Sequence, residues 1–280
     1  MARIPRPTPE QLATLTRMER VAFELGDASA RYGTLWARAY NSVVLSAVVW
    51  SCAGRRLHAH GVEHFAPMDG RSRVLLVANH RSFFDFFTVM AVTFWYTRLS
   101  RRIFFPVRGT FFYDHPFGPV VNGTMSAMRM FPPVLRESTK KVWNAYSVQR
   151  CIDELAVPGT LIGMHPEGTR SRGDDPYALL PGQPGAGRIA LESEGAHVVP
   201  VFVLGMGNSL TEEFRRNWTA PEDTRIDVHI GAPIDFSDLR ANKDSADSIR
   251  AATDRIMGRI RALAEDNRRL RANLAADAAR

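Results

Sequence analysis

Cysteine is scarce in this sequence: Cys52 and Cys151 are the two cysteines in 280 residues, and no CxxC spacing joins them. Their scarcity excludes a disulfide framework and a structural zinc site built on cysteine pairs, and a reducing compartment is the expected environment. The histidines His80, His115 and His165 are scattered along the chain. We therefore expect no metal site.

Lysine is also rare, because Lys140, Lys141 and Lys243 are the only lysines among 36 basic residues, and the others are arginine. Against 29 Asp and Glu, the basic residues give a formal charge of +7. A guanidinium group binds phosphate through two parallel hydrogen bonds, and a basic chain favours anionic partners. Composition leaves three classes of partner open: nucleic acid, acidic lipid and a phosphorylated ligand.

No hydrophobic run is long enough to cross a bilayer. The stretch 39–54 has 16 residues without a charged side chain, which is short of the roughly 18 to 20 that a transmembrane helix needs. The N-terminus is polar and contains prolines, and no apolar signal-peptide segment follows it, so we do not expect secretion. We interpret 39–54 as an apolar helix that is buried or lies in the membrane interface.

The apolar content is sufficient for a folded core, since 45% of the residues are hydrophobic and 23% are charged. Global disorder is excluded, and the length fits one large or two small domains. Short, continuous apolar runs predict strands at 74–78, 160–164 and 197–204, with helical stretches between them. A further strand at 225–230 alternates charged and apolar residues, which predicts a half-exposed strand at a sheet edge. We expect an α/β fold, a mixed sheet flanked by helices.

Both ends of the chain are expected to be helical. Residues 8–57 predict an N-terminal segment of two helices, broken near Gly26 and Gly33. From residue 244 onward, apolar residues recur at seven-residue steps, which predicts an amphipathic helix docked on the domain. These residues are Ile249, Ile256, Leu263 and Leu270.

Phenylalanine is concentrated in one region, because 11 of the 16 lie between residues 83 and 131, interleaved with arginines. Such a mixture fits an ordinary core, a lipid-facing surface or a platform on which nucleic-acid bases stack. Several of these residues come as adjacent pairs, which places apolar side chains on two sides of any helix or strand. We expect most of them in the core.

The first candidate site is a strand followed by a histidine and an aspartate, VLLVANHRSFFD at 74–85. On one continuous helix His80 and Asp85 would point about 140° apart. The S-x-x-D signature from Ser82 to Asp85 instead predicts a helix that starts at Ser82, with His80 in the preceding loop and Asp85 in the first turn. His80 would then stand at the carboxyl end of a strand, where open α/β sheets bind ligands.

This pair suits general base catalysis. A carboxylate on one imidazole nitrogen fixes the tautomer and leaves the other nitrogen as a base. The chain has no G-x-S-x-G nucleophile motif, so the attacking hydroxyl would come from a substrate. The alternative is that Asp85 only caps the helix and that His80 is an ordinary loop histidine.

The second candidate site is HPEGTRSR at 165–172, which follows the strand predicted at 160–164. Gly168 permits a close approach of the backbone to a ligand, and Arg170 and Arg172 can each bind phosphate oxygens. Glu167 would accept a hydrogen bond from a ligand hydroxyl or hold Arg170 in position. The alternative is a polar turn at a strand end.

Together, NHRSFFD and the later PEGTRS resemble the glycerolipid acyltransferase family, whose familiar members are the 1-acylglycerol-3-phosphate acyltransferases. The resemblance covers residues 58–210. HPFG at 115–118 is similar to the P-x-x-G segment of this family, and VVPV at 198–201 is similar to its fourth motif. MFPPVLR at 130–136 occupies the place of the second motif, which ends in a phosphate-binding arginine, here Arg136.

The resemblance implies direct acyl transfer without an acyl-enzyme. His80 would deprotonate the hydroxyl of a lysophospholipid, with 1-acylglycerol 3-phosphate as the expected acceptor, and Asp85 would orient His80. The alkoxide would attack the thioester of acyl-CoA or of acyl carrier protein, which are co-substrates, so no cofactor is expected. The glycerol phosphate of the acceptor would be held by Arg136, Glu167, Gly168, Thr169 and Arg170.

The resemblance also implies that the protein acts on its substrates at a membrane surface. We expect residues 1–57 to be a helical membrane-docking segment, 58–243 the α/β acyltransferase domain and 244–280 the docked helix. Trp36 and Trp50, with arginines nearby, suit acidic lipid. The expected location is the cytoplasmic face of the membrane, as a peripheral or monotopic protein. The alternative is that the N-terminal helices simply cover the sheet.

Other functions stay open at this point. The same chemistry fits glycerol 3-phosphate, another lysophospholipid or an aminolipid, because the chain lacks the lysine that this family often has shortly after PEGTRS. A catalytically silent lipid-binding homologue would keep the fold, and a hydrolase would use Ser82 or Ser171. A nucleic-acid binder is the least expected, since the arginines follow no helix-turn-helix or single-strand-binding pattern.

Overall fold

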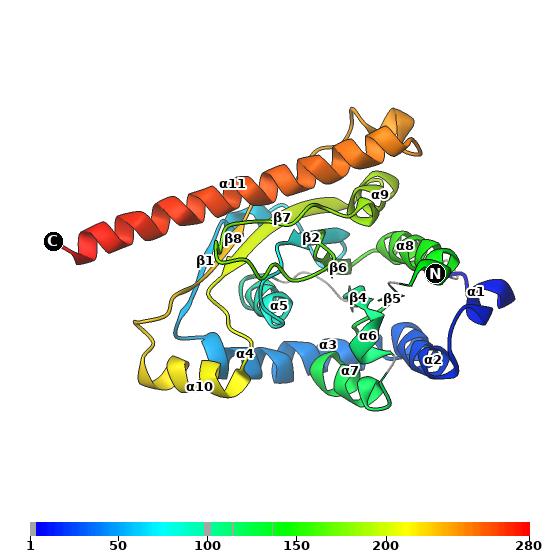
Figure 1. Ribbon diagram of the computed structural model, residues 1–280, viewed down its shortest axis with the longest axis horizontal. Coiled ribbons are helices and arrows are strands. Elements are labelled where there is room, and N and C mark those ends of the chain that lie inside the picture. The colour runs from blue at the N-terminus through cyan, green and yellow to red at the C-terminus, as the bar shows by residue number, and fades with distance from the viewer. Residues whose placement is uncertain (1–3, 98–101, 114, 136) are drawn as a thin grey trace.

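A mixed sheet lies at the centre of the computed structural model, which describes residues 4–97, 102–113, 115–135 and 137–280 (Figure 1). Its six strands follow the order β1-β8-β7-β2-β6-β3, and neighbours are parallel except for the antiparallel pair β7 and β8. The α/β fold with a mixed sheet is thereby confirmed. The strands are β1 (Leu57–His60), β2 (Val74–Ala78), β3 (Arg102–Phe104), β6 (Thr160–Met164), β7 (His197–Leu204) and β8 (Ile226–Ile230), with β4 (Val107–Arg108) and β5 (Pro133–Val134) as a separate pair.

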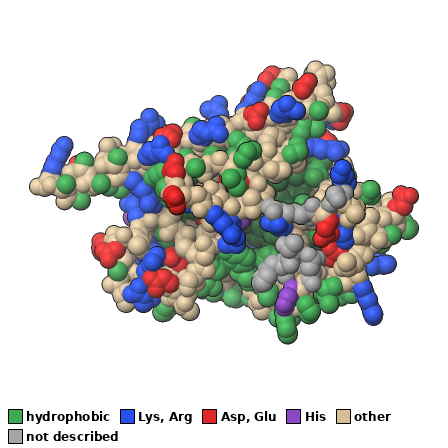
Figure 2. All heavy atoms as spheres, viewed as in Figure 1, with side chains coloured by type: hydrophobic (Ala, Val, Ile, Leu, Met, Phe, Trp, Pro, Cys, Tyr) green, Lys and Arg blue, Asp and Glu red, His purple; other side chains and the backbone are tan. Residues whose placement is uncertain are grey.

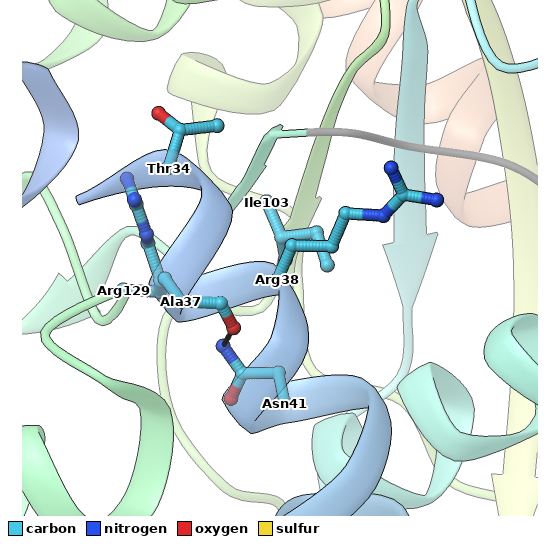
Figure 3. A pocket seen from close by; sticks show the side chains of 6 residues that line it. All are labelled: Thr34, Ala37, Arg38, Asn41, Ile103 and Arg129. Carbon is cyan, nitrogen blue, oxygen red and sulfur yellow. Dashed lines mark hydrogen bonds between the residues drawn. The ribbon is translucent and has the colours of Figure 1, made fainter. Parts of the chain in front are cut away.

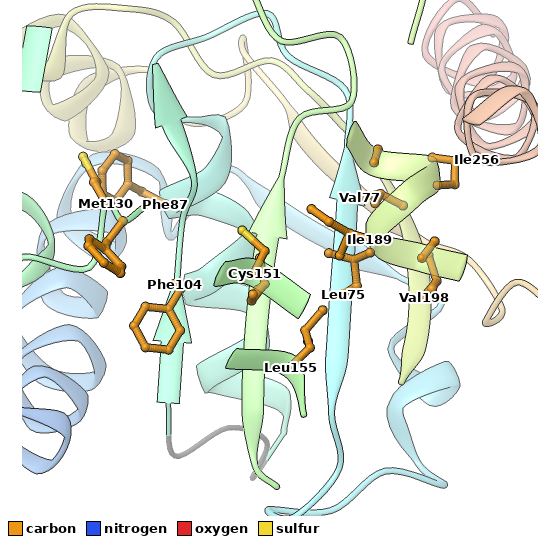
Figure 4. Packing of buried hydrophobic residues seen from close by; sticks show 14 of the residues in the cluster. Leu75, Val77, Phe87, Phe104, Met130, Cys151, Leu155, Ile189, Val198 and Ile256 are labelled. Carbon is orange, nitrogen blue, oxygen red and sulfur yellow. The ribbon is translucent and has the colours of Figure 1, made fainter. Parts of the chain in front are cut away.

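The three strands predicted from continuous apolar runs are β2, β6 and β7, and β2 lies between the other two. A strand in this position is covered on both faces, which explains why every residue of β2 is apolar and buried. Leu75 and Val77 pack on one face with Val198, Ile189 and Ile256 (Figure 4). The alternate residues of β2 pack on the other face, in a second hydrophobic cluster.

Helices cover both faces of the sheet. In Figure 1, α8, α9 and α11 lie on one side, and α3, α4, α7 and α10 lie on the other side, beyond α5. Figure 2 shows a hollow in the middle of the same view, with hydrophobic side chains gathered in it. The helices of the central part of the chain are η2 (Val62–Phe65), α5 (Asp85–Tyr96), α6 (Gly109–Phe112), α7 (Gly118–Ser126), η3 (Ser138–Lys140), α8 (Lys141–Leu155), α9 (Pro184–Glu192), α10 (Leu210–Thr219) and η4 (Arg240–Asn242).

The N-terminal segment is helical, but its breaks differ in part from the prediction. It contains α1 (Pro9–Ala13), α2 (Arg17–Tyr32), α3 (Thr34–Tyr40), the π-helical turn η1 (Asn41–Leu45) and α4 (Ser46–Ala53). The break at Gly33 is confirmed. The break at Gly26 is wrong, because Gly26 lies inside α2, where a Cβ would come within 2.7 Å of the Phe131 ring. The glycine at this position makes room for an aromatic side chain.

The apolar stretch 39–54 is neither fully buried nor fully exposed. Val49 and Ala53 are buried against the core, while Val43 and Trp50 are 68% and 50% exposed. Among the residues that the structure describes, no helix has the length and apolar character needed to span a bilayer.

The position predicted for the strand at 225–230 is wrong. β8 is buried along its whole length and lies between β1 and β7, so it is not an edge strand. Its charged residue Asp227 is buried because two arginines satisfy it: Arg225 Nε and Arg271 Nε donate to its carboxylate at 2.6 and 2.9 Å. The charged residue that alternates with apolar ones in this strand therefore belongs to a buried ion pair, and it does not indicate a solvent-exposed face of the strand.

The C-terminal helix α11 (Ala246–Ala278) begins after Ser245, whose hydroxyl accepts a hydrogen bond from the N–H of Ser248. It packs against α9 and β7, and its C-terminal turns extend past the sheet (Figure 1). Asn267 is polar but fully buried where α11 contacts β8, and its amide lies 3.1 Å from His229 Nε2. The division of the chain into segments 1–57, 58–243 and 244–280 stays a prediction.

Candidate active site

His80 is placed by the way in which β2 ends. The side chain of Asn79 is buried, donates to the carbonyl of Val203 at 2.9 Å and accepts from the N–H of Val203 at 2.7 Å. This side chain continues the pairing of β2 with β7 for one residue beyond the strand. The chain then turns away from the sheet, and His80 lies in the loop before α5, as predicted.

Asp85 is the first residue of α5 and is buried. Its Oδ2 accepts hydrogen bonds from the N–H groups of Arg81 and Ser82, both at 2.6 Å. The prediction that the helix starts at Ser82 is therefore wrong by three residues, although the carboxylate does reach back to the N–H of Ser82. The hydroxyl of Ser82 is used elsewhere, because it donates to the carbonyl of Gly207 and accepts from the N–H of Phe84.

The structure brings His80 and Asp85 together. Nδ1 of His80 lies 3.5 Å from Oδ2 of Asp85, and the two side chains are 20% and 2% exposed. Nδ1 is buried and has no hydrogen-bond partner among the described residues. A proton on Nδ1 would face the carboxylate, which leaves Nε2 with a free lone pair.

Burial shifts the pKa values of both groups toward their neutral forms. Burial, and to a smaller extent the nearby Arg170 guanidinium, lower the pKa of His80 to about 4. Burial raises the pKa of Asp85 to about 6, against the opposing effect of the two backbone N–H groups. At pH 7 the imidazole is therefore neutral and able to accept a proton, while most of Asp85 is ionised.

Glu167 is buried and connects the loop after β2 with a distant part of its own loop, which runs from β6 to α9. Its Oε1 accepts from the N–H of His80 and its Oε2 from the N–H of Leu180, both at 2.7 Å. Both carboxylate oxygens are thus bonded to backbone groups of this chain, so Glu167 fixes the backbone of His80 directly. The sequence suggested a ligand hydroxyl or Arg170 as its partner.

The remaining residues of the second cluster lie on the same loop. Gly168 has φ +66°, a left-handed conformation that favours glycine. Thr169 is partly buried, and Arg170 donates from one guanidinium nitrogen to Oδ1 of Asn208 at 3.0 Å. Arg172 is exposed. Arg136 lies outside the described residues.

Asn208 is a site residue that was not predicted from the sequence. Its Oδ1 accepts from Arg170 and also from the N–H of Phe83 at 2.8 Å, so it connects the loops that follow β2 and β6. Asn208 itself follows β7, a parallel neighbour of β2. Because carboxyl ends of parallel strands meet at one sheet edge, a polar residue just after the strand predicted at 197–204 was a usable signal.

A second group of side chains lies in the part of the sheet formed by β1 and β8. Ligand atoms of His60, Asp227 and His229 all lie within 4.8 Å of one another, a spacing compatible with a metal ion. However, Arg225 and Arg271 both donate to Asp227, and Arg225 also lies 3.3 Å from Nε2 of His60. Two guanidinium groups at this distance repel a cation, so these residues do not fit a metal site.

One small pocket lies between α3 and β3. It is lined by Thr34, Ala37, Arg38, Asn41, Ile103 and Arg129 (Figure 3). The guanidinium groups of Arg38 and Arg129 point to different sides, so they do not converge on one anion.

A neutral histidine base, a buried carboxylate and an arginine at the same sheet edge are the groups expected of an enzyme that activates an alcohol for group transfer. Residues 56–204 match the family model described as Acyltransferase, which is more than half of the chain. The protein therefore belongs to the acyltransferase family, and the resemblance to glycerolipid acyltransferases is confirmed.

One relative gives this family match more detail. The chain is 29% identical over 147 residues to the chloroplastic 1-acyl-sn-glycerol-3-phosphate acyltransferase BAT2 of Brassica napus. The matched stretch covers 52% of this chain and 37% of that relative. The chain thus corresponds to little more than a third of the protein that it resembles.

Proposed function

We propose that this protein is an O-acyltransferase that moves a fatty acyl group from acyl-CoA or acyl carrier protein to the hydroxyl of 1-acylglycerol 3-phosphate in phospholipid synthesis. The observation that carries the proposal is the neutral His80 with Nδ1 3.5 Å from the buried carboxylate of Asp85. Membership of the acyltransferase family and the name of the Brassica napus relative support the reaction and the acceptor.

The proposed reaction needs one base and no protein nucleophile. Nε2 of His80 takes the proton of the acceptor hydroxyl as the oxygen attacks the thioester carbonyl. The C–O bond forms, the C–S bond breaks, and the proton on His80 passes to the departing thiolate. The carboxylate of Asp85 stabilises the imidazolium while it exists.

The two candidate serine nucleophiles are engaged in other contacts, which favours transfer over a hydrolase with an acyl-serine. Ser82 donates to the carbonyl of Gly207, and the hydroxyl of Ser171 donates to the carbonyl of Ala178 at 3.2 Å. A serine nucleophile would instead donate to a base.

For the acceptor phosphate we propose Arg170 and the backbone of Gly168 and Thr169 as ligands, with Arg136 as a further cation. Arg170 is the described arginine whose charge acts on His80, so a phosphate bound to it would lie close to the base. Asn208 fixes one guanidinium nitrogen at 3.0 Å, which leaves the other donors of the guanidinium group for phosphate oxygens.

We also propose that the N-terminal helices dock on the cytoplasmic face of a membrane, and that α10 belongs to the same surface. Trp36 on α3 is 68% exposed, and Trp50 on α4 and Trp218 on α10 are 50% and 44% exposed. The rings of Trp50 and Trp218 are in edge-on contact at 5.6 Å, and Arg55 lies over Trp218. Exposed tryptophans beside arginines are typical of surfaces that bind acidic lipid.

The proposed reaction is tested by incubating the full chain with a donor whose acyl group is labelled, either acyl-CoA or acylated acyl carrier protein, and with a panel of acceptors. The panel contains 1-acylglycerol 3-phosphate, glycerol 3-phosphate, another lysophospholipid and an aminolipid. We expect labelled phosphatidate and at most weak labelling of the other products. A different preferred acceptor would overturn the substrate assignment. If the protein transferred the acyl group to none of the acceptors, the proposal that it is an acyltransferase would be overturned.

Docking is tested by sedimentation with vesicles of phosphatidylcholine alone or mixed with phosphatidylglycerol. We expect binding to the mixed vesicles, with loss in a variant that combines Trp50→Ala and Trp218→Ala. Equal sedimentation of this variant and the wild type would contradict the proposed surface.

A further inference from the structure

We propose that His165 is a positioning residue that holds the imidazole of His80 by stacking on it. This inference rests on the proposed function, because it concerns the same base. The rings of His80 and His165 are 3.9 Å apart between centroids and lie within 4° of parallel. Such overlap covers one face of the His80 ring.

His165 is itself held by contacts from two other elements. Its Nδ1 lies 3.0 Å from the carbonyl of Ala78 at the end of β2, so this nitrogen carries the proton and donates. The ring of Phe86 on α5 meets it edge-on at 5.9 Å and 89°. Phe86 reaches this place because Gly163 leaves room for it, since a Cβ on Gly163 would lie 1.7 Å from the Phe86 ring. His165 is therefore a fixed surface for His80.

Asp85 does not fix His80 alone. Its distance of 3.5 Å to Nδ1 is at the limit of a hydrogen bond, and its Oδ2 already accepts from two backbone N–H groups. The backbone N–H of His80 is held by Glu167, but that bond leaves rotation of the ring free. The stacked ring restricts this rotation, which keeps Nδ1 toward Asp85 and Nε2 toward the substrate.

The stack also affects protonation. The ionisable groups that face His80 are Asp85 from α5 and His165 and Arg170 from the loop after β6, with Glu167 and Arg81 bonded nearby. Burial lowers the pKa of His165 to about 3, so it is neutral when His80 works as a base. Removal of the ring would expose a face of His80 to water, and the pKa of His80 would rise toward the ordinary value of about 6.5.

Two substitutions separate the ring from its hydrogen bond. His165→Phe keeps a flat ring and loses the donor to Ala78, whereas His165→Gln keeps a donor and loses the ring. We expect His165→Phe to retain kcat within about 3-fold, and His165→Gln to lose kcat by about 10- to 100-fold with KM nearly unchanged. If His165→Gln fails to fold, His165→Met takes its place, because it fills the volume without a flat ring.

The second readout is independent of turnover. Imidazole proton–carbon NMR spectra of the full chain, without substrates, follow the titration of His80, with His80→Ala used to assign its signal. We expect His80 to titrate at a higher pH in His165→Gln than in the wild type, and His165→Phe to match the wild type. Equal titration of His80 in all three proteins, or full kcat in His165→Gln, would overturn the stacking role.

The outcomes distinguish this inference from the proposed function. A wild-type protein without acyl transfer overturns the proposed function, while the NMR titration still tests the contact between the rings. An active wild type with an inactive His80→Ala and a fully active His165→Gln overturns only the role of His165.

Discussion

Two stacked histidine pairs, each beside an aspartate, occupy different parts of the same sheet. His80 and His165 lie 3.9 Å apart next to Asp85, and His60 and His229 lie 4.3 Å apart next to Asp227. The residue types are alike, but their partners are not. Asp227 is paired with two arginines, and His229 lies within hydrogen-bond distance of Asn267.

Among the described residues, the cluster of His80, His165 and Asp85 has no arginine hydrogen-bonded to its carboxylate. Asp85 accepts hydrogen bonds from two backbone N–H groups, and Nδ1 of His80 has no hydrogen-bond partner within the ranges that the structure describes. The arginines lower the pKa of Asp227 although burial opposes them, whereas burial dominates at Asp85 and raises its pKa to about 6. The comparison teaches that spare hydrogen-bonding capacity, more than residue type, distinguishes a reactive cluster from a structural one.

The largest expected difference between the two clusters is in turnover. His80→Ala should lower kcat by about 10³- to 10⁴-fold, because the base that takes the hydroxyl proton is lost. His60→Ala is the matched control and should stay within about 3-fold of the wild type, since it lies in the other cluster. The measurement is the initial rate of acyl transfer with saturating donor and acceptor. Similar losses in both variants would remove the functional distinction between the clusters.

Substitutions of the two aspartates should have opposite effects: one should lower the stability of the fold and the other should lower the activity. Asp227→Asn removes a buried carboxylate from two partly exposed arginines and should cost about 1–3 kcal/mol of unfolding free energy, with activity per folded molecule retained. Asp85→Asn should lose most activity without loss of stability, because the raised pKa of Asp85 means that burying its charge opposes folding near pH 7. Urea unfolding followed by circular dichroism and an activity assay on the same samples measures both effects. A destabilised Asp85→Asn with full activity would reverse the assignment.

The pH dependence should show the two ionisations of the reactive cluster. As the pH falls through about 6, Asp85 gains a proton and kcat/KM should begin to fall, and a steeper loss should follow near pH 4, when His80 gains its proton. In Asp85→Asn, the fall in kcat/KM near pH 6 should disappear from the residual activity, and the fall near pH 4 should remain. Profiles of kcat/KM from pH 3.5 to 9 for both proteins check this. If the first fall were unchanged in Asp85→Asn, that ionisation would belong to another group.

The smallest expected effect concerns Asn208, which touches Arg170 and not the base. Asn208→Ala should raise KM for the acceptor by about 3- to 10-fold and leave kcat nearly unchanged, because it frees the guanidinium group to move. Rates measured over a range of acceptor concentrations provide both constants. A loss confined to kcat would contradict a role in binding the acceptor.

The sequence predicted those features that depend on local pattern. β2, β6 and β7 were found because a strand covered on both faces is apolar along its whole length. The meeting of His80 and Asp85 was predicted from a strand end followed by a capping signature, and only the first residue of α5 differed.

The features that were missed depend on contacts between distant parts of the chain. The interior position of β8 requires β1 beside it and Arg271 from α11, and the glycine inside α2, Gly26, makes room for Phe131 from a distant part of the chain. The stacking of His165 and the bond from Arg170 to Asn208 arise only when three strand ends meet. The sequence could place Asn208 at this edge of the sheet, because it follows a predicted strand, but it contains no local signal for which side chains pair there.

The most direct test of the account is product analysis after incubation of the wild type with labelled acyl-CoA and 1-acylglycerol 3-phosphate, beside His80→Ala and His60→Ala. The account predicts labelled phosphatidate and one free thiol per product with the wild type and His60→Ala, a rate about 10³- to 10⁴-fold lower with His80→Ala, and no label on the protein. Labelled phosphatidate from His80→Ala at the wild-type rate, or label retained covalently on the wild-type chain, would contradict it.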